Sequence, residues 1–208
     1  MKEIARTVGV SSATASRWIR DIELTDEQRR VLSAHDRGDR VAAGQRHSER
    51  ARRRRAAWQA EGAQRARQRR PLHLAGCMLF WAEGSRSRNS VYFTNSDPAM
   101  VRFFLDFLVG EIGVERDAVR IDVNLFADHV AEQEGIERHW LETLDLPRAC
   151  LRASTINVYS RHSARKRLNR LPYGTCRLSV HSTHIVQHLY GAIQEYGGFT
   201  RPQWLDCG

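Results

Sequence analysis

The sequence predicts an α+β protein in three parts: a pair of helices over residues 1–24, a basic helical connector over residues 25–70 and a larger domain over residues 71–208. The first part places apolar residues at helical spacing on both sides of Gly9. The connector is rich in arginine and other helix-forming residues. The last part contains four short stretches in which apolar and polar residues alternate, which predicts strands with one polar face.

The composition favours a partner that carries many negative charges. The 208 residues have a net charge of +9 and a pI of about 10.1, which favours nucleic acid or an anionic membrane surface. No apolar run reaches the roughly 18 residues of a membrane-spanning helix, and the N-terminus has no apolar signal region. The four cysteines form no Cys-x-x-Cys pair, so we expect reduced thiols in a cytoplasmic protein.

The first twenty residues have the pattern of a helix-turn-helix. Gly9 suits the tight turn, Ala5 is small where two helices would cross, and Ser11 or Ser12 suits the cap of the second helix. The residues expected to face inward are Ile4, Val8, Ala15, Trp18 and Ile19. The residues expected to face the major groove or the phosphates of DNA are Ser12, Ala13, Ser16, Arg17 and Arg20. An ordinary helical hairpin is the alternative.

Such units usually contain a further helix that completes their core. We therefore expect a later segment, or residues upstream, to supply that helix.

The connector opens with a capping box, Thr25-Asp26-Glu27-Gln28. Residues 29–70 contain 14 arginines, no lysine and four acids, and we expect an exposed, partly helical segment interrupted by Gly38, Gly44 and Gly62. The guanidinium group suits phosphate oxygens. The segment is therefore interpreted as a phosphate-binding surface, with a solvated charge run as the alternative; its densest stretch is Arg52, Arg53, Arg54 and Arg55.

Residues 74–85 form an apolar run that ends in Glu83, Gly84 and Ser85. This pattern predicts a buried helix closed by Gly84 in a left-handed conformation. The run resembles the LAGLIDADG motif of homing endonucleases, in which the motif helix ends in an acid followed by Gly and often Ser. The matching residues are Leu79, Ala82, Glu83, Gly84 and Ser85; Met78 stands where the family has a helix-crossing Gly, and Trp81 where it often has Asp or Gly.

The segments after this run predict a sheet covered by helices. Strands are expected at residues 91–94, 119–125, 155–159 and 175–181, and helices at residues 98–112, 128–145 and 183–196. The resemblance, which covers about residues 72–197, implies helices on one side of a curved antiparallel sheet that saddles DNA with its other side. A hairpin usually follows the motif helix in that family, whereas one strand is clear here.

A DNA-facing sheet would present the polar residues of its strands. Those proposed to read bases are Arg120, Asn124, Arg177, Ser179 and His181, beside Tyr92, Thr94, Asp122, Asn157, Tyr159 and Thr175. A basic loop between the last two strands, which contains Arg165, Lys166 and Arg167, would hold phosphates. A solvated polar face is the alternative.

The resemblance also implies a role for Glu83. In the family the acid at this position holds a divalent ion, here Mg²⁺, that activates water for phosphodiester cleavage. One motif supplies one acid, so cleavage of both strands would require a homodimer packed through the motif helices. The alternative is a helix-end acid bonded to neighbouring backbone amides. His184 and His188, near His181, lack a carboxylate in the same turn, so no metal is expected there.

Two functions remain open. The first is sequence-specific binding of double-stranded DNA by a regulator-like protein without a required cofactor, which the bulky Met78 and Trp81 favour. The second is a homodimeric Mg²⁺-dependent endonuclease, which Glu83 favours. Attachment to a membrane is not expected, because no amphipathic apolar stripe accompanies the arginines.

Overall fold

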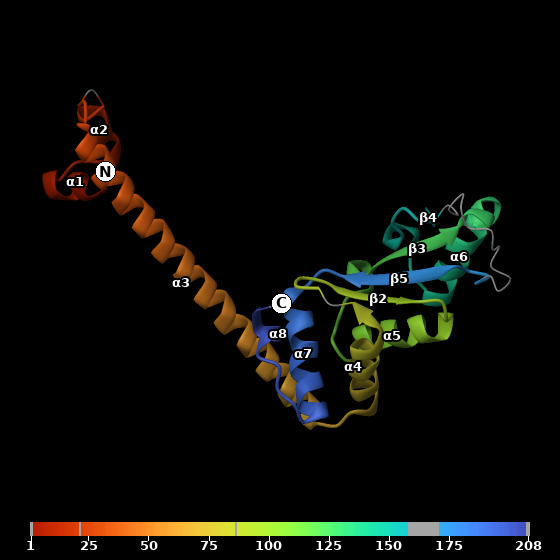
Figure 1. The fold of residues 1–208 in the computed structure, drawn as a ribbon. Helices are drawn as coiled ribbons and strands as arrows, with labels where there is room; N and C mark the ends of the chain where they lie inside the picture. Colours follow the sequence, from red (N-terminus) through yellow and green to blue (C-terminus); the bar gives the residue numbers. More distant parts are fainter. Residues whose placement is uncertain (1, 21, 86, 158–170, 207–208) are drawn as a thin grey trace, which may run out of the picture. The chain divides into compact units, whose positions relative to one another are not determined.

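The computed structural model describes residues 2–20, 22–85, 87–157 and 171–206 (Figure 1). Its contacts divide the chain into two compact units, Met1–Arg50 and Ala51–Gly208. The division falls inside a helix rather than at Pro71, where the sequence suggested a boundary. Among the described residues, no helix has both the length and the apolar character needed to cross a membrane.

The first unit contains the expected helix pair, α1 (Lys2–Val8) and α2 (Ser12–Trp18). Gly9 between them has a φ of 74°, in the left-handed region that favours glycine. Ser11 caps α2, because its hydroxyl accepts a hydrogen bond of 3.1 Å from the Thr14 backbone N–H. Ala5 and Ala15 are buried where the two helices cross. The turn, the cap and the small crossing residue are confirmed.

The inward-facing set of this unit is corrected. Trp18 is 60% exposed, Ile4 and Val8 are also exposed, and Ile19 is half-buried. Two seven-residue helices share one narrow interface, and the two alanines fill it. Within the described part of this unit, the larger apolar side chains therefore have no additional element to pack against.

Helix α3 (Asp26–Arg67) begins at the predicted capping box. The Thr25 backbone N–H donates to Gln28 Oε1 over 2.9 Å, and the Gln28 N–H donates to Thr25 Oγ1 over 3.3 Å. The helix is continuous, so the expected interruptions at Gly38, Gly44 and Gly62 were wrong. A glycine costs a helix only about 1 kcal/mol relative to alanine, and the alanines, arginines and glutamines around these positions favour the helix.

The second unit is an α+β structure. Residues 51–67 of α3 precede helices α4 (Pro71–Glu83), α5 (Pro98–Gly110), α6 (Gln133–Leu144), α7 (Thr183–Gly197) and α8 (Gln203–Asp206). The strands are β1 (Gly84–Ser85), β2 (Val91–Asn95), β3 (Arg120–Phe126), β4 (Thr155–Asn157) and β5 (Thr175–Val180). Short 3-10 turns are η1 (Arg116–Ala118), η2 (Ala127–Glu132) and η3 (Arg148–Cys150).

The strands form a five-stranded sheet in the order β1-β2-β5-β3-β4. Its pairs are antiparallel except β3 and β4, which are parallel, so the expected fully antiparallel sheet is corrected at that edge. Helices α4 and α5 pack against one face (Figure 1). There Phe93 stacks on Phe104 of α5 with ring centroids 4.3 Å apart, and the buried apolar residues of β3 are Ile121, Val123 and Leu125.

The end of α4 differs from the sequence expectation. Gly84 has a φ of −74° and a ψ of 143°, so the chain passes directly from helix into strand without a left-handed residue. Gly84 and Ser85 then pair with Phe93 and Tyr92, which supplies the short antiparallel pair that the sequence pattern did not reveal. The helix itself has one buried face, since Leu74 and Trp81 are exposed.

A close crossing joins α3 to α7. A Cβ atom added at Gly62 would lie 1.9 Å from the His188 carbonyl oxygen, and one added at Gly191 would lie 1.9 Å from the Gln59 carbonyl oxygen. Residues 51–67 are therefore part of the second unit's core, in which Ala66 is fully covered. The expectation that the whole connector is exposed is corrected for Arg55, Gly62 and Ala66, which are buried, whereas other residues of this stretch, such as Arg53, remain exposed.

We predict that Gly191→Ala lowers the free energy of unfolding by about 1–3 kcal/mol, because its methyl group would overlap backbone that cannot rotate away. The control is Gly44→Ala in α3, where a Cβ meets nothing within 4 Å; it should raise stability by about 0.5–1 kcal/mol. Urea unfolding followed by circular dichroism measures both changes, and a neutral Gly191→Ala would contradict the close crossing.

Candidate nucleic-acid interface

The polar face of the sheet gathers the strand residues that the sequence proposed for DNA contact. Register places Thr94, Arg177 and Asp122 in one row across β2, β5 and β3. A neighbouring row contains Tyr92, Ser179 and Arg120, and Asn124 lies half-buried beside Thr175. The sheet therefore brings side chains from three separate segments onto one surface.

Arg177 is the best-positioned cation of this face. Its Nε donates to Asp122 Oδ1 over 2.9 Å, and its guanidinium carbon lies 5.7 Å from the centre of the Tyr92 ring. The Arg177 side chain is 45% exposed, whereas the Asp122 side chain is 3% exposed. The two terminal amino groups of Arg177 have no partner among the described residues. Such a pair of parallel donors matches paired acceptors, such as guanine O6 and N7 or two phosphate oxygens.

The alternation of β3 predicts Asp122 on this face but does not indicate a role for it. Its second carboxylate oxygen is buried and has no hydrogen-bond partner among the described residues. Only the cross-strand register shows that Asp122 lies beneath Arg177, since 55 residues separate the two in the chain.

Two other proposed base-reading residues have structural partners. Ser179 is 1% exposed and donates its hydroxyl hydrogen to the Arg120 carbonyl oxygen over 3.2 Å. The Arg120 guanidinium donates to the carbonyl oxygens of Val119 and Asp117. The proposed contact of Ser179 with bases is corrected, because its hydroxyl is covered and joins two strands.

His181 lies at the rim of the same face and is exposed. Its Nε2 lies 2.9 Å from a terminal nitrogen of Arg152, and its Nδ1 lies 2.7 Å from Ser90 Oγ. Because an arginine can only donate, Nε2 accepts and Nδ1 carries the hydrogen. His181 thus positions Arg152, a cation that the sequence pattern did not single out.

The helix-turn-helix residues form a surface of the first unit. Ser12, Ser16 and Arg17 lie on the exposed side of α2, and Arg20 is exposed just beyond the end of this helix. Side chains near the start of such a helix are the ones that usually reach base edges.

Some arginines of the run have protein partners, and others are exposed. Arg52 donates to Asp206 of α8 over 3.1 Å, and the buried Arg55 donates to the Leu205 carbonyl oxygen. Arg54 lies over the Trp58 ring at 5.9 Å, whereas Arg53 is exposed.

Carboxylates distant in the sequence hold further arginines of α3 and the segment after it. Arg65 and Arg70 both contact Glu111, whose side chain is 3% exposed, and Arg67 contacts Glu195. Phosphate contact by the whole run is therefore corrected, because several of these guanidinium groups already have protein partners. Arg165, Lys166, Arg167 and Tyr159 lie outside the described residues.

Glu83 ends α4 as an exposed side chain. Neither a backbone amide nor a second carboxylate meets it within the described parts of the chain. Mg²⁺ requires several oxygen ligands in near-octahedral geometry. A single chain therefore does not fit Mg²⁺ at Glu83 unless another molecule adds ligands.

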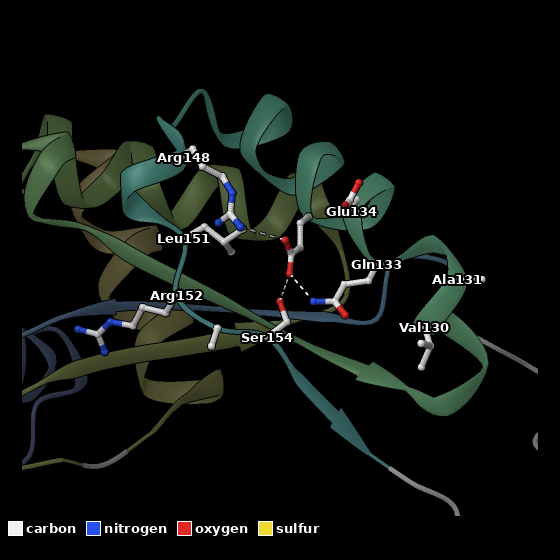
Figure 2. A pocket seen from close by; sticks show the side chains of 10 residues that line it. Val130, Ala131, Gln133, Glu134, Arg148, Leu151, Arg152 and Ser154 are labelled. Atoms are coloured by element: carbon white, nitrogen blue, oxygen red, sulfur yellow. Dashed lines mark hydrogen bonds and ion pairs between the residues drawn. The ribbon is translucent and has the colours of Figure 1, made fainter.

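A polar pocket of about 630 Å³ lies between α6 and the segment that leads into β4 (Figure 2). Glu137 accepts hydrogen bonds there from Gln133 over 2.9 Å and Ser154 over 2.7 Å, and its other oxygen lies 3.5 Å from Arg148. Glu137 itself is buried, so these polar partners satisfy a covered carboxylate. These bonds fasten the chain before β4 onto α6.

A chain of polar side chains runs between α4, α7 and α3. The Tyr196 hydroxyl lies 2.8 Å from His73 Nδ1, and His73 Nε2 lies 3.3 Å from His188 Nε2. Glu61 lies 3.0 Å from His184 Nε2 and 3.7 Å from His188 Nδ1. Tertiary packing thus supplies the carboxylate that the sequence around the histidines lacks.

Burial controls the protonation of these groups. It lowers the pKa of His73 to about 4 and raises the pKa of Tyr196 to about 12. Burial likewise lowers the pKa of His188, against the opposing effect of Glu61. The His73 and His188 rings are therefore neutral at neutral pH.

No family model, curated protein or solved structure matches this chain.

We predict that acid destabilises the protein through His73. Its folded pKa of about 4 lies below the unfolded value of 6.5, so the stabilisation is complete above about pH 6.5 and is lost as the pH falls toward 4. From about pH 7.5 to about pH 5 this contribution falls by about 2 kcal/mol. Urea unfolding at both pH values should show a smaller loss for His73→Phe than for the unaltered protein. Equal losses in the two proteins would contradict the assignment to His73.

Proposed function

We propose that this protein binds double-stranded DNA in a sequence-specific manner, with α2 and the polar sheet face as two contact surfaces, and acts as a regulator-like DNA-binding protein. The observation that carries the proposal is the pair of Arg177 and Asp122. A buried carboxylate holds an exposed guanidinium by Nε, and the two terminal amino groups of that guanidinium have no partner among the described residues.

The pair favours base recognition over phosphate contact. Asp122 offsets the charge of Arg177, which weakens attraction to a phosphate but retains the directional donors that a guanine edge requires. Because Asp122 and the Tyr92 ring hold the guanidinium, less side-chain freedom would be lost on binding. Exposed cations such as Arg53, and the overall net charge of +9, supply the less specific attraction to DNA.

The helix-turn-helix supports the same function from the first unit. Its exposed Ser12, Ser16 and Arg17 offer short hydroxyls and one long guanidinium along a single helix. That set suits a major-groove edge and the phosphates beside it.

Metal-dependent cleavage by a homodimer is the second candidate. The exposed Glu83 favours it, and the exposed Leu74 and Trp81 of α4 offer an apolar surface on which a second copy would pack. Trp81 packs against Phe199 with ring centroids 5.2 Å apart, so a bulky aromatic pair occupies this surface. Close packing of two α4 helices is therefore less favourable than it would be with small residues.

The test is selection from a random-sequence duplex library in the presence of Mg²⁺, with separate recovery of bound and cleaved molecules. We predict a bound sequence motif without cleaved ends. Site-specific ends that disappear with Glu83→Gln would instead establish the nuclease, and the absence of any enriched sequence would contradict specific binding.

Variants of the Arg177–Asp122 pair test the sheet face in the same selection. Arg177→Ala should cost about 1–3 kcal/mol at sites that carry one particular base pair, and little elsewhere. Asp122→Asn should strengthen binding to all sequences and steepen the salt dependence by up to about one unit, because it unmasks a positive charge. The matched control is Arg138→Ala, which removes an exposed arginine from α6. If Arg177→Ala weakens all sequences equally, Arg177 contacts phosphate instead.

Variants of two neighbouring arginines distinguish an effect on DNA binding from an effect on folding stability. Arg53 is exposed, so Arg53→Ala should reduce the slope of log affinity against log salt by about one unit without a change in melting temperature. Arg55 is buried and bonded to the Leu205 carbonyl, so Arg55→Ala should lower stability by about 1–3 kcal/mol. Fluorescence anisotropy at several salt concentrations and thermal unfolding measure the two effects. A reversed pattern would show that the exposed arginine is structural.

A further inference from the structure

Three potential metal ligands converge where α3 crosses α7. Within the described residues, Glu61, His184 and His188 offer ligand atoms that all lie within 4.8 Å of one another. The His184 Nε2 atom lies 3.0 Å from one oxygen of Glu61, and the His188 Nδ1 atom lies 3.7 Å from the other. All three residues belong to the unit Ala51–Gly208.

The fold explains why these side chains meet. His184 and His188 are four residues apart on α7, so they lie on one side of that helix. Glu61 precedes Gly62, whose lack of a side chain lets α3 approach the His188 backbone closely. The same glycine contact that joins the helices therefore brings the carboxylate to the two imidazoles.

The spacing suits one small ion. Zinc bonds of about 2.0–2.1 Å in tetrahedral geometry place neighbouring ligand atoms about 3.3 Å apart. The separations of 3.0 and 3.7 Å join the two histidines to different oxygens of Glu61, and the three ligand atoms lie within 4.8 Å of one another, so the side chains need to draw closer around one ion. Side-chain rotations are sufficient to admit the ion, because the Glu61 and His184 side chains are 54% and 46% exposed.

Partners behind His188 orient its ring. Its Nε2 faces His73 Nε2 at 3.3 Å, and His73 Nδ1 in turn faces the Tyr196 hydroxyl at 2.8 Å. When His188 donates its Nε2 hydrogen to His73, its Nδ1 lone pair is directed toward Glu61. Metal-bound histidines generally donate their other ring hydrogen in this way.

We propose that Glu61, His184 and His188 bind a divalent transition-metal ion, with Zn²⁺ as the best match, and that the ion fastens α3 to α7. Two imidazoles and one carboxylate suit zinc and its transition-metal neighbours, whereas Mg²⁺ and Ca²⁺ prefer oxygen ligands. Three protein ligands leave a fourth position for water or another small ligand. The three residues also line a cavity of about 670 Å³, which gives that position room.

Binding of the ion would stabilise the second unit against unfolding, and this effect would not require DNA. The ion joins residue 61 to residues 184 and 188, and those ligands do not form a site in an unfolded chain. Binding therefore favours the folded state in proportion to metal concentration. The site is separate from Glu83 and from the Arg177–Asp122 pair, so failure of either proposal leaves the other testable.

The experiment uses the full chain after chelator treatment and dialysis. Titration with ZnCl₂ by calorimetry should show one site per chain, and Co²⁺ should give the visible absorption of a four-coordinate complex. At free zinc of about 100 times Kd, the melting temperature should rise by about 5–10 °C. Loss of a residue that only hydrogen-bonds a metal ligand typically weakens metal binding about 10–100-fold. His184→Ala and Glu61→Gln remove ligands themselves, so each should weaken Zn²⁺ binding by more than that.

Control variants distinguish this site from nonspecific Zn²⁺ binding to other surface residues. Both altered side chains are about half exposed, so the metal-free variants should melt close to the unaltered protein. His47→Ala and Glu134→Gln remove an exposed histidine and an exposed glutamate elsewhere and should leave zinc affinity unchanged. Absence of Zn²⁺ binding, or binding that His184→Ala and Glu61→Gln do not weaken, would overturn the proposal.

Discussion

The close contact between Gly62 of α3 and the His188 backbone of α7 is the constraint on which the second unit depends. Together with Gly191 against Gln59, it lets two helices cross with almost no side chain between them. Polar groups around the crossing then pair: Gln59 donates to Gln187 over 2.7 Å, and Gln194 donates to Gln59 over 3.2 Å. The final turns of α3 become part of the core for this reason, and the boundary between the units falls within the helix.

The packing of α3 against α7 also determines which arginines are bonded within the protein and which are exposed. Once residues 51–67 are packed, Arg55, Arg65 and Arg67 lie beside carbonyl or carboxylate groups of the same unit. Others, such as Arg53, remain exposed. The basic segment therefore combines two tasks, internal pairing that holds α3 in place and a positive surface on the turns that face solvent.

Because side chains alternate along each strand, one face of the sheet packs on the helices and the other carries the polar residues proposed to contact DNA. Ile121 and Val123 point to the helices, whereas Asp122 between them points to the other face and holds Arg177. The cost of burying a carboxylate is reduced when a guanidinium pairs with it. Ser179 and Arg177 lie two positions apart on the same face of β5. The short Ser179 side chain is covered, whereas the longer Arg177 side chain extends beyond its neighbours into solvent.

The sequence by itself determined the local features. The turn at Gly9, the cap at Ser11, the capping box at Thr25, the helix that ends at Glu83 and the alternation of β2, β3 and β5 all follow from interactions within a few residues. The tertiary structure alone decided the parallel pairing of β4, the burial of Arg55 and Glu137 and the meeting of Glu61 with two histidines. Those features depend on groups far apart in the chain, and which distant groups meet is set by how the helices and strands pack, which no local pattern encodes.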